Sequence, residues 1–498
     1  MATWDFAMDL DRRRGASLSV QIARAISEDI QRGRLHPGDR LPGSRTLART
    51  LRVHRQTVVS AIDDLIAEGW IVSRRGSGVF VADGIPDSSL RPRAPAEPTQ
   101  RAAPRRFPLE LARPPDPELP SDGGARTLLM SGSRPDVRLV PADLIGRSYR
   151  RAARAAGPAV LSYNHPAGSP RLRRQLAIML SAARGLVADP ESILVTRGSQ
   201  MALALLARTL TRPGDAVAVE HPGYRPAWEA FRLAGAQILP VPVDERGLDV
   251  RALARLASRR PIRAVYVTPH HQFPTTVTLA GPRRLELLEL ARRARFAVIE
   301  DDYDHEFHYS GAPVLPLASI DRAGVVVYVG TLSKVLAPGL RLGFIAAPPN
   351  LIDHVVAYRT YMDLHGDHVL ESAIAELLED GLIQRHVRRM RRVYRARLEA
   401  LAIGLRRELG DFVRFTEPPG GTAIWVRART GQAMVQWARA SRERGVLFDA
   451  GSAFTLTGPP FPAARLGFAC LTEAEIERAV QTLAAAAHVC RRGARSPK

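Results

Sequence analysis

Beyond about residue 190 the chain alternates short apolar segments with amphipathic ones, and this alternation restricts its fold more than any other feature. Apolar runs with the composition of buried strands lie at residues 193–195, 216–219, 264–267, 297–299 and 325–329. Helical periodicity marks residues 201–210 and 285–294. Strands that alternate with helices in this way build a mostly parallel sheet covered by helices. The sequence therefore predicts an α/β domain.

The first 82 residues follow a different pattern. Three segments between residues 18 and 69 have helical spacing, and Ser44 is the expected N-cap of the second. Two β-type runs, 70–73 and 79–81, follow around a glycine-containing turn. Three helices and a hairpin indicate a winged helix-turn-helix. The apolar positions expected in its core are Val20, Ile22, Ile26, Ile30, Val58, Ile62, Leu65 and Ile66.

The segment between these two patterns is rich in proline and charge and has little apolar periodicity, which is a linker composition. A chain of 498 residues is also too long for one ordinary domain. We therefore divide it into a winged-helix domain (1–82), a linker (83–125) and a large α/β domain (126–498).

Composition restricts the compartment and the kind of partner. The only cysteines, Cys470 and Cys490, argue against a disulfide scaffold and fit a reducing cytoplasm. No apolar run is long enough to span a bilayer, and the first residues lack the apolar core of a signal peptide. The net charge is +21, of which residues 1–83 carry only roughly +3. Bulk charge therefore does not mark the N-terminal domain as a DNA-binding domain, and we expect a cytoplasmic protein without membrane contact.

The helix-turn-helix pattern itself indicates DNA binding. Such a motif inserts its second helix in the major groove, while basic and small residues around it hold phosphates. Arg45 opens the first helix of the pair, and His54, Arg55 and Thr57 surround the start of the second. Gly76 in the turn of the hairpin would allow close approach of the backbone to DNA. The alternative is a structural three-helix module with solvated arginines.

Polar motifs follow several of the predicted strands. Pyridoxal phosphate requires a lysine, an acid at its pyridine nitrogen, an aromatic ring that stacks on the pyridine, and a phosphate site. Lys334 follows the last apolar run, and Asp301 follows the one before it, with Tyr303 positioned for the phenolic oxygen. Tyr224 is the candidate stacking ring. The residues expected at the phosphate are Gly198, Ser199, Gln200, Thr331, Ser333 and Arg341.

A competing interpretation concerns His305 and His308, which lie three residues apart among carboxylates and could bind a metal. Because Asp301 and Tyr303 are already assigned to the cofactor, we expect no metal and treat the two histidines as ordinary loop residues.

The N-terminal motifs resemble those of GntR-family regulators over nearly all of residues 16–82. The matching segments are 38–45, 47–48, 53–58, 67–69 and 76–81. Two positions depart from the family pattern: His54 stands where serine is usual, and Ile62 stands where an aromatic residue is usual. His54 is therefore a candidate for altered base choice.

Residues 126–498 resemble fold-type-I aminotransferases. The resemblance implies a smaller C-terminal α+β lobe, at about residues 386–498. It also implies that Tyr163 reaches the cofactor phosphate of the partner subunit and that Arg465 binds a substrate carboxylate. Thr275-Thr276 replaces the usual Thr-Gly, and Asn164-His165 replaces a common Gly-Asp, so the substrate pocket is expected to differ.

The two domains together resemble the MocR/GabR group of bacterial regulators. This implies a head-to-tail homodimer that binds promoter DNA and uses pyridoxal phosphate as a sensing group. An amine or amino acid would displace Lys334 from an aldimine and change DNA binding or the recruitment of RNA polymerase. Two alternatives remain: an active pyridoxal-phosphate-dependent aminotransferase that carries a DNA-binding domain, and a regulator that senses the cofactor itself. We expect little or no turnover.

Overall fold

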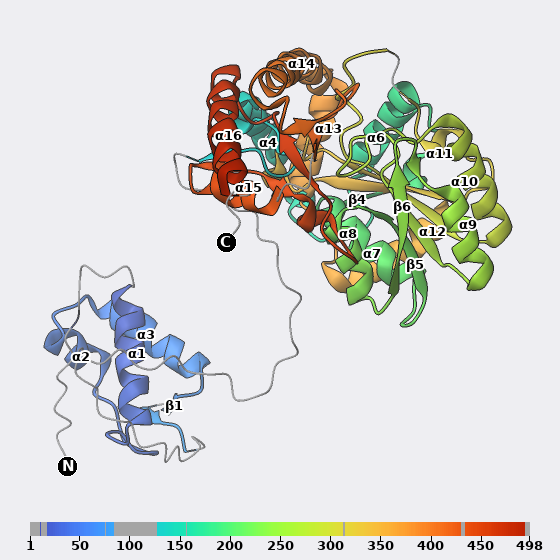
Figure 1. The fold of residues 1–498 in the computed structure, drawn as a ribbon. Helices are drawn as coiled ribbons and strands as arrows, with labels where there is room; N and C mark the ends of the chain where they lie inside the picture. The colour runs from blue at the N-terminus through green and yellow to red at the C-terminus, as the bar shows by residue number, and fades with distance from the viewer. Residues whose placement is uncertain are drawn as a thin grey trace. The chain divides into compact units, whose positions relative to one another are not determined.

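The computed structural model describes residue 10 and residues 17–74, 76–83, 127–155, 157–311, 314–429 and 434–493. It divides the chain into two compact units, Met1–Arg113 and Pro114–Lys498, which are drawn in Figure 1 and treated separately below. The predicted linker, residues 83–125, lies outside the described residues except for Asp83.

The N-terminal unit is a winged helix-turn-helix, as predicted. Helices α1 (Leu18–Gln31), α2 (Ser44–Thr50) and α3 (Arg55–Ala67) are followed by the antiparallel pair β1 (Ile71–Arg74) and β2 (Gly78–Val81). One core holds them together. Its buried members include Ile22, Ile26, Ile30, Leu41, Leu47, Val58, Leu65, Ile71 and Val81.

Three expectations for this unit are wrong in detail. Val20 is 51% exposed and Ile66 is 37% exposed, because each lies at the edge of its helix's apolar face. Ser44 is the first residue of α2, and Gly43 occupies the N-cap position without a side-chain hydrogen bond. Residue type alone had indicated the cap, whereas the backbone dihedral angles decide where a helix begins.

The large unit is built on an eight-stranded sheet in the order β4-β11-β10-β9-β8-β5-β6-β7. The strands β10, β9, β8, β5 and β6 run parallel, whereas β11 is antiparallel to both neighbours and β7 is antiparallel to β6. The mostly parallel α/β sheet predicted from the sequence is therefore confirmed. The strand bounds are β4 Ile193–Thr196, β5 Ala216–His221, β6 Gln237–Asp244, β7 Gly247–Leu248, β8 Ala264–Val267, β9 Ala297–Asp302, β10 Val326–Thr331 and β11 Gly343–Ala346.

Helices cover both faces of this sheet (Figure 1). Successive residues of a strand point to opposite faces, and so Val217 and Val219 join the core under α7, α8 and α12 while Ala218 joins a second core under α9 and α10. Burial on both sides explains the uninterrupted apolar runs of the sequence. The helices are α4 Ala142–Ala155, α5 Gly157–Val160, α6 Pro170–Arg184, α7 Ser199–Leu210, α8 Arg225–Leu233, α9 Val250–Arg259, α10 Gly281–Ala294, α11 Leu317–Ile320, α12 Pro349–Met362 and α13 His368–Glu379.

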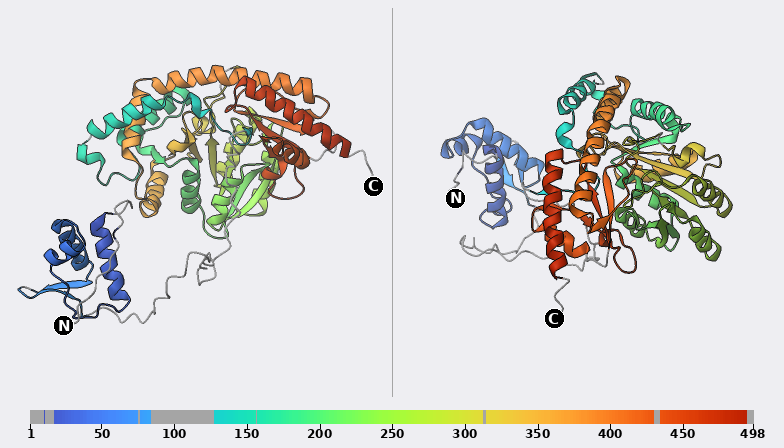
Figure 2. Two further views of the ribbon diagram at one scale, coloured as in Figure 1. Left: turned by 90° about the vertical axis from the view of Figure 1, so that its left-hand side faces the viewer. Right: turned by 45° about the horizontal axis from the view of Figure 1, so that its top comes forward.

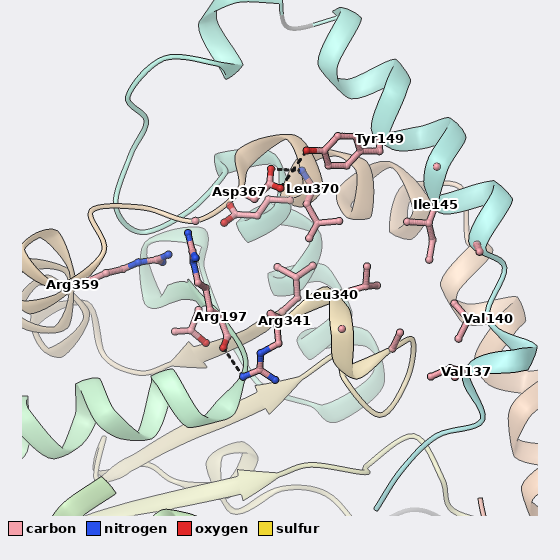
Figure 3. Close-up of a pocket in the computed structure, with 18 residues that line it drawn as sticks. Val137, Val140, Ile145, Tyr149, Arg197, Leu340, Arg341, Arg359, Asp367 and Leu370 are labelled. Carbon is pink, nitrogen blue, oxygen red and sulfur yellow. Dashed lines mark hydrogen bonds between the residues drawn. The ribbon is translucent and has the colours of Figure 1, made fainter. Parts of the chain in front are cut away.

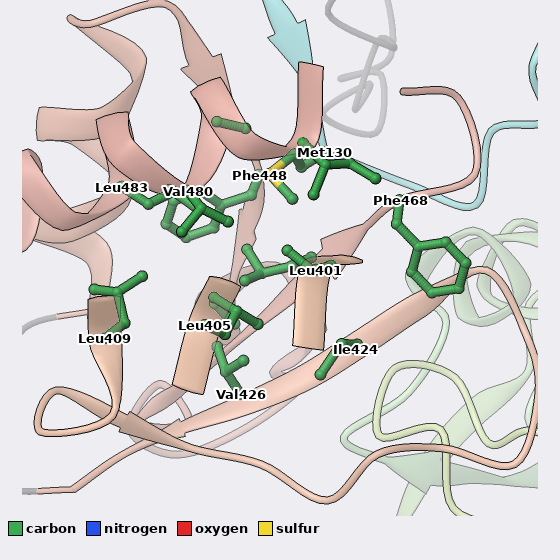
Figure 4. Close-up of a cluster of buried hydrophobic side chains, with 14 of the residues drawn as sticks. Met130, Leu401, Leu405, Leu409, Ile424, Val426, Phe448, Phe468, Val480 and Leu483 are labelled. Atoms are coloured by element: carbon green, nitrogen blue, oxygen red, sulfur yellow. The ribbon is translucent and has the colours of Figure 1, made fainter. Parts of the chain in front are cut away.

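The C-terminal part forms a smaller α+β lobe. The long helix α14 (Leu382–Leu409) and α16 (Glu473–Gly493) pack side by side, as Figure 2 shows, against a four-stranded sheet. Leucines and valines of these elements fill the core drawn in Figure 4. The remaining elements are β12 Val413–Arg414, β13 Ala423–Ala428, α15 Met434–Arg442, β14 Val446–Leu447, β15 Asp449–Ala450 and β16 Ala463–Gly467.

The first described residues of the large unit also belong to this lobe. Strand β3 (Leu128–Leu129) pairs in parallel with β14, and Met130 lies in the same core. The carbonyl of Met130 accepts a hydrogen bond from the Gly467 amide at 2.7 Å. A segment far from the lobe in sequence is therefore part of it.

Among the residues that the structure describes, no helix combines the length and the apolar character needed to cross a membrane.

Candidate functional site

A cavity of about 1150 Å³ lies where the carboxyl ends of β9 and β10 meet the small lobe and the start of α7. Residues of the large sheet domain line one side of this cavity. Residues such as Ser133 and Asp449 line the side that faces them. Nine of the residues proposed from the sequence line it: Ser199, Gln200, Tyr224, Asp301, Tyr303, Thr331, Ser333, Lys334 and Arg341.

Asp301 lines this cavity at the end of β9 and is 4% exposed. Its Oδ2 accepts a hydrogen bond from the Tyr266 hydroxyl at 2.8 Å, and its buried Oδ1 has no partner among the described residues. Burial raises the pKa of Asp301 to about 7, and the nearby Lys334 opposes that rise. A protonated pyridine nitrogen would supply the missing donor, so this carboxyl fits pyridoxal phosphate.

Lys334 is the amine of the cavity and lies in the turn after β10. Removal from water lowers its pKa to about 8, and the positive charge of Arg465 contributes to the lowering. Asp301 and Asp304 act in the opposite direction. A lysine with a lowered pKa is more often neutral near pH 7, as a nucleophilic amine must be.

Close backbone packing shapes the end of the cavity at the α7 N-terminus. Gly198, with φ +78°, is the N-cap of α7, and a Cβ there would lie 2.8 Å from Nη2 of Arg341. A Cβ on Gly343 would lie 2.8 Å from the backbone of Gly198. Arg341 donates to the carbonyl of Arg197 at 3.0 Å. The open helix N-terminus, this guanidinium and the hydroxyls of Thr331 and Ser333 together suit a phosphate group.

Sequence reasoning missed two aromatic residues of the site. Tyr266 donates a hydrogen bond to Asp301 from within β8. In the sequence it stands in an apolar run, and so it was interpreted only as a buried strand residue. Phe273 lies 5.1 Å from the Tyr224 ring between centroids and 4.6 Å from the Arg465 guanidinium. A tyrosine in a fully buried strand was the available signal for Tyr266, because its hydroxyl requires a partner there.

Arg465 lies on β16 and is 1% exposed. It donates to the Gly132 carbonyl at 3.0 Å and to the Ser133 hydroxyl at 2.7 Å, and its Nε has no partner among the described residues. The guanidinium thus adjoins the cavity while being held by the segment that enters the small lobe.

Tyr163 lies apart from the cavity of its own chain. It is 85% exposed, and its nearest aromatic contact is the edge of His365 at 6.4 Å between ring centroids. Leu161 and Tyr361 are also largely exposed.

A second cavity of about 1070 Å³ is also lined by Arg341 (Figure 3). Arg197 and Arg341 line it together with Tyr149 and Asp367, whose side chains form a hydrogen bond of 3.3 Å. Arg341 is therefore shared by the two cavities.

The proposed DNA-contacting residues gather in the N-terminal unit. Arg45, His54, Arg55 and Gly76 are exposed, and Thr57 is half-buried. The Arg55 Nε donates to the Ser44 hydroxyl at 3.4 Å, which joins the starts of α2 and α3. Gly76 has φ +77°, so the turn itself requires glycine. His54 is the N-cap of α3, where its Nδ1 accepts from the Gln56 amide at 3.3 Å.

His305 and His308 are not the ordinary loop histidines that we expected. Both are buried, beside His270 and His271. Burial lowers the pKa of His270 to about 3 and also lowers that of His308. Burial opposes protonation of His305 as well, but the adjacent Asp302 carboxylate raises its pKa above the usual range. Sequence distance hid this arrangement, because the four imidazoles follow two different strands.

Comparison with known proteins agrees with both units. Residues 141–483 match the family described as aminotransferase class I and II, and residues 18–81 match bacterial regulatory proteins of the gntR family. The chain is 32% identical to the probable rhizopine catabolism regulatory protein MocR of Rhizobium meliloti, over 96% of this chain and 95% of that protein.

Two further matches are a transcriptional regulator and an aminotransferase of known structure. The HTH-type pyridoxine biosynthesis transcriptional regulator PdxR of Corynebacterium glutamicum is 33% identical, over 79% of this chain and 80% of that protein. The crystal structure of LysN, an alpha-aminoadipate aminotransferase of Thermus thermophilus complexed with N-(5'-phosphopyridoxyl)-L-leucine, matches with a TM-score of 0.69 at 32% identity, over 74% of this chain and 94% of that one. The chain therefore belongs to the MocR-type transcriptional regulators, in which a GntR-family helix-turn-helix domain is joined to an aminotransferase class I and II domain.

Proposed function

We propose that this transcriptional regulator holds pyridoxal phosphate at Lys334 and responds to an amine or amino acid, or to the cofactor itself, with a change in its affinity for promoter DNA. The observation that carries the proposal is that Lys334 and Asp301 line one cavity. The Oδ1 atom of Asp301 is buried there without a hydrogen-bond partner among the described residues. When bound, pyridoxal phosphate supplies an aldehyde that condenses with primary amines. A cytoplasmic location fits a regulator that must reach DNA.

Each residue of the cavity has a different proposed part of the cofactor or ligand to bind. Asp301 offers Oδ1 to a pyridine N–H while Tyr266 holds Oδ2. The α7 N-terminus and Arg341 would receive the phosphate. Tyr303 and Tyr224 line the same cavity, where Tyr303 would face the phenolic oxygen and Tyr224 would stack on the ring. Arg465 would bind the carboxylate of an amino-acid ligand bidentately.

A head-to-tail homodimer is part of the proposal. Tyr163 projects from the surface of its own chain, and a partner subunit that presents the same residue would complete the phosphate site at Arg341. The neighbouring exposed Leu161 and Tyr361 supply apolar area for such an interface. RNA polymerase is a further proposed partner on promoter DNA.

The second candidate is an active aminotransferase that carries a DNA-binding domain. It is favoured because Lys334, Asp301 and the candidate phosphate-binding residues line one cavity, with Arg465 close to Lys334. Both candidates need Lys334, so turnover separates them. Sustained conversion of amino donor with a keto-acid acceptor, at about 1 per second or faster, without any ligand effect on DNA affinity, would establish the enzyme and refute the sensor.

The lysine composition makes the cofactor test unusually clean, because Lys334 and Lys498 are the only lysines in the sequence. Cofactor-free protein titrated with pyridoxal phosphate is expected to gain visible absorbance, and borohydride is expected to fix the cofactor on the peptide that contains Lys334. Lys334→Ala should abolish both signals and the ligand effect on operator binding, whereas the control Lys498→Arg should change neither. Label on Lys498 alone, or no absorbance at any concentration, would refute the site.

DNA contacts are tested separately from the cofactor. We expect Arg55→Ala to weaken operator binding by about 1–3 kcal/mol if Arg55 contacts a base, or to lower the salt slope by about 1 if it contacts a phosphate. Arg385, exposed in the large unit, supplies the matched control Arg385→Ala. Unchanged operator affinity after substitution of both Arg45 and Arg55 would contradict the assigned surface.

A further inference from the structure

Four histidines come together beside the cofactor cavity but outside its lining. His270 and His271 follow β8, and His305 and His308 follow β9, with exposures of 4, 1, 6 and 8%. The His270 ring centroid lies 4.4 Å from that of His271, 4.8 Å from that of His305 and 5.9 Å from that of His308. Neither the cofactor nor the proposed ligand uses these side chains.

Their nitrogen atoms lack partners to an unusual degree. Both ring nitrogens of His270 and the Nε2 of His271 are buried without a hydrogen-bond partner among the described residues, and a nitrogen of His308 lies near them. Buried polar atoms in folded proteins are nearly always satisfied, so a group of orphaned nitrogens in one place requires an explanation. A metal ion is the ligand that satisfies several imidazole nitrogens at once.

Asp304 prepares His271 for this role. The Asp304 Oδ1 lies 2.8 Å from the His271 Nδ1, and both side chains are 1% exposed. A carboxylate that accepts from Nδ1–H fixes the tautomer in which Nε2 carries the free lone pair. The same carboxylate–histidine arrangement supports metal-bound histidines in general.

We propose that His270, His271 and His308 form a binding site for a divalent transition-metal ion such as Zn²⁺. One nitrogen from each lies within 4.8 Å of the other two. Tetrahedral zinc with Zn–N bonds of about 2.0 Å needs nitrogens about 3.3 Å apart, so side-chain rotation must close the triad. The rival triad of His270, Asp302 and His305 is less suited, because Asp302 already faces His305 at 3.0 Å and accepts from the Tyr328 hydroxyl at 2.7 Å.

The site would connect three parts of the large unit. His308 forms a β-bridge with Gly420 of the small lobe, and Gly421 donates its amide to the Phe307 carbonyl at 2.6 Å. The Tyr303 hydroxyl donates to the His271 carbonyl at 3.0 Å. An ion bound by the triad would therefore fix the loop that carries Tyr303 and join it to the small lobe, which is a structural role.

The test is metal binding by the full-length protein, prepared without a histidine tag and stripped with a chelator. We expect about one Co²⁺ or Zn²⁺ per chain, with visible ligand-field bands for Co²⁺ that indicate tetrahedral nitrogen coordination. Zn²⁺ should raise the melting temperature of the large unit and slow amide hydrogen exchange at residues 268–273 and 304–309.

Three variants make the outcome specific. His308→Leu should lose stoichiometric binding, the Co²⁺ bands and the Zn²⁺ effect on melting. His308→Cys should keep binding and add a sulfur-to-cobalt charge-transfer band, which also shows that position 308 tolerates substitution. The control His386→Leu, which changes another buried histidine outside the cluster, should bind like the native chain. Equal Co²⁺ binding by the native protein and His308→Leu, or no stoichiometric binding by the native protein, would overturn the proposal.

Discussion

At the scale of single residues, the structure adds a detail to two side chains that the sequence marked as functional. His54 caps α3 with an imidazole nitrogen in the place where a serine hydroxyl is usual. Asp301 keeps one oxygen without a partner among the described residues. The sequence predicted that Asp301 meets the pyridine nitrogen, but the hydrogen bond that occupies only one of its oxygens comes from Tyr266 on another strand. The sequence marked His54 only as a candidate DNA contact, because a cap depends on backbone angles that residue type does not give.

The cap at α3 predicts the effect of two substitutions. His54→Ser should preserve the stability of the N-terminal unit, since a hydroxyl accepts the same amide hydrogen bond. His54→Ala should destabilise that unit by about 1 kcal/mol. Urea denaturation followed by circular dichroism measures both. If the two variants have equal stability, the imidazole does not act as a cap.

The raised pKa of Asp301, about 7, predicts a pH dependence of the cofactor-free protein. The folded state holds a proton on Asp301 that the unfolded state releases above about pH 4. Stability is therefore expected to fall as pH rises from about 4 to 7, and Asp301→Asn should make this fall shallower in melting experiments. It should not abolish it, because burial raises the pKa of Glu220, Glu300 and Glu371 to about 7 as well. The exposed Asp353→Asn is the control, and equal slopes for both variants would contradict the assignment.

At the scale of elements, the strands were the predictable part of the fold. Burial on both faces left apolar runs in the sequence, and the polar residues that follow them met at one cavity because parallel strands end at one edge. The sequence did not predict contacts between elements that lie far apart along the chain, because no periodicity links such elements. The His270 pair and the His305 pair follow separate strands, and β3 lies far in sequence from β14, so no local periodicity reported either association.

The close approach of β11 to the start of α7 predicts that a larger residue at position 343 weakens cofactor binding. In Gly343→Ala the new methyl group would meet the Gly198 backbone, which should shift the α7 N-terminus and Arg341 and weaken pyridoxal phosphate binding by about 10-fold or more, equal to about 1.4 kcal/mol. Gly339→Ala is the matched control, because a Cβ there meets nothing within 4 Å. Absorbance titration measures both affinities, and equal affinity for the two variants would refute the steric argument.

At the scale of the whole molecule, the two units have separate cores, and the described residues of the N-terminal core all lie in Leu10 to Val81. This predicts two calorimetric transitions. Ile26→Ala should lower only the N-terminal one, since truncation of a fully buried isoleucine costs about 2–5 kcal/mol. Pyridoxal phosphate should raise only the other. A single transition that responds to both changes would show that the units unfold together.

The pairing of β3 with β14 also decides where the large unit is attached to the rest of the chain. The polypeptide that arrives from the DNA-binding unit meets the first described structure of the large unit on the small lobe, at residues 128–133, and Arg465 holds the end of that segment through Gly132 and Ser133. A carboxylate that bound Arg465 would compete with the Gly132 carbonyl and the Ser133 hydroxyl for its N–H groups. If Arg465 binds the ligand as proposed, ligand binding would act directly on the segment through which the chain enters the small lobe, because one guanidinium would hold both.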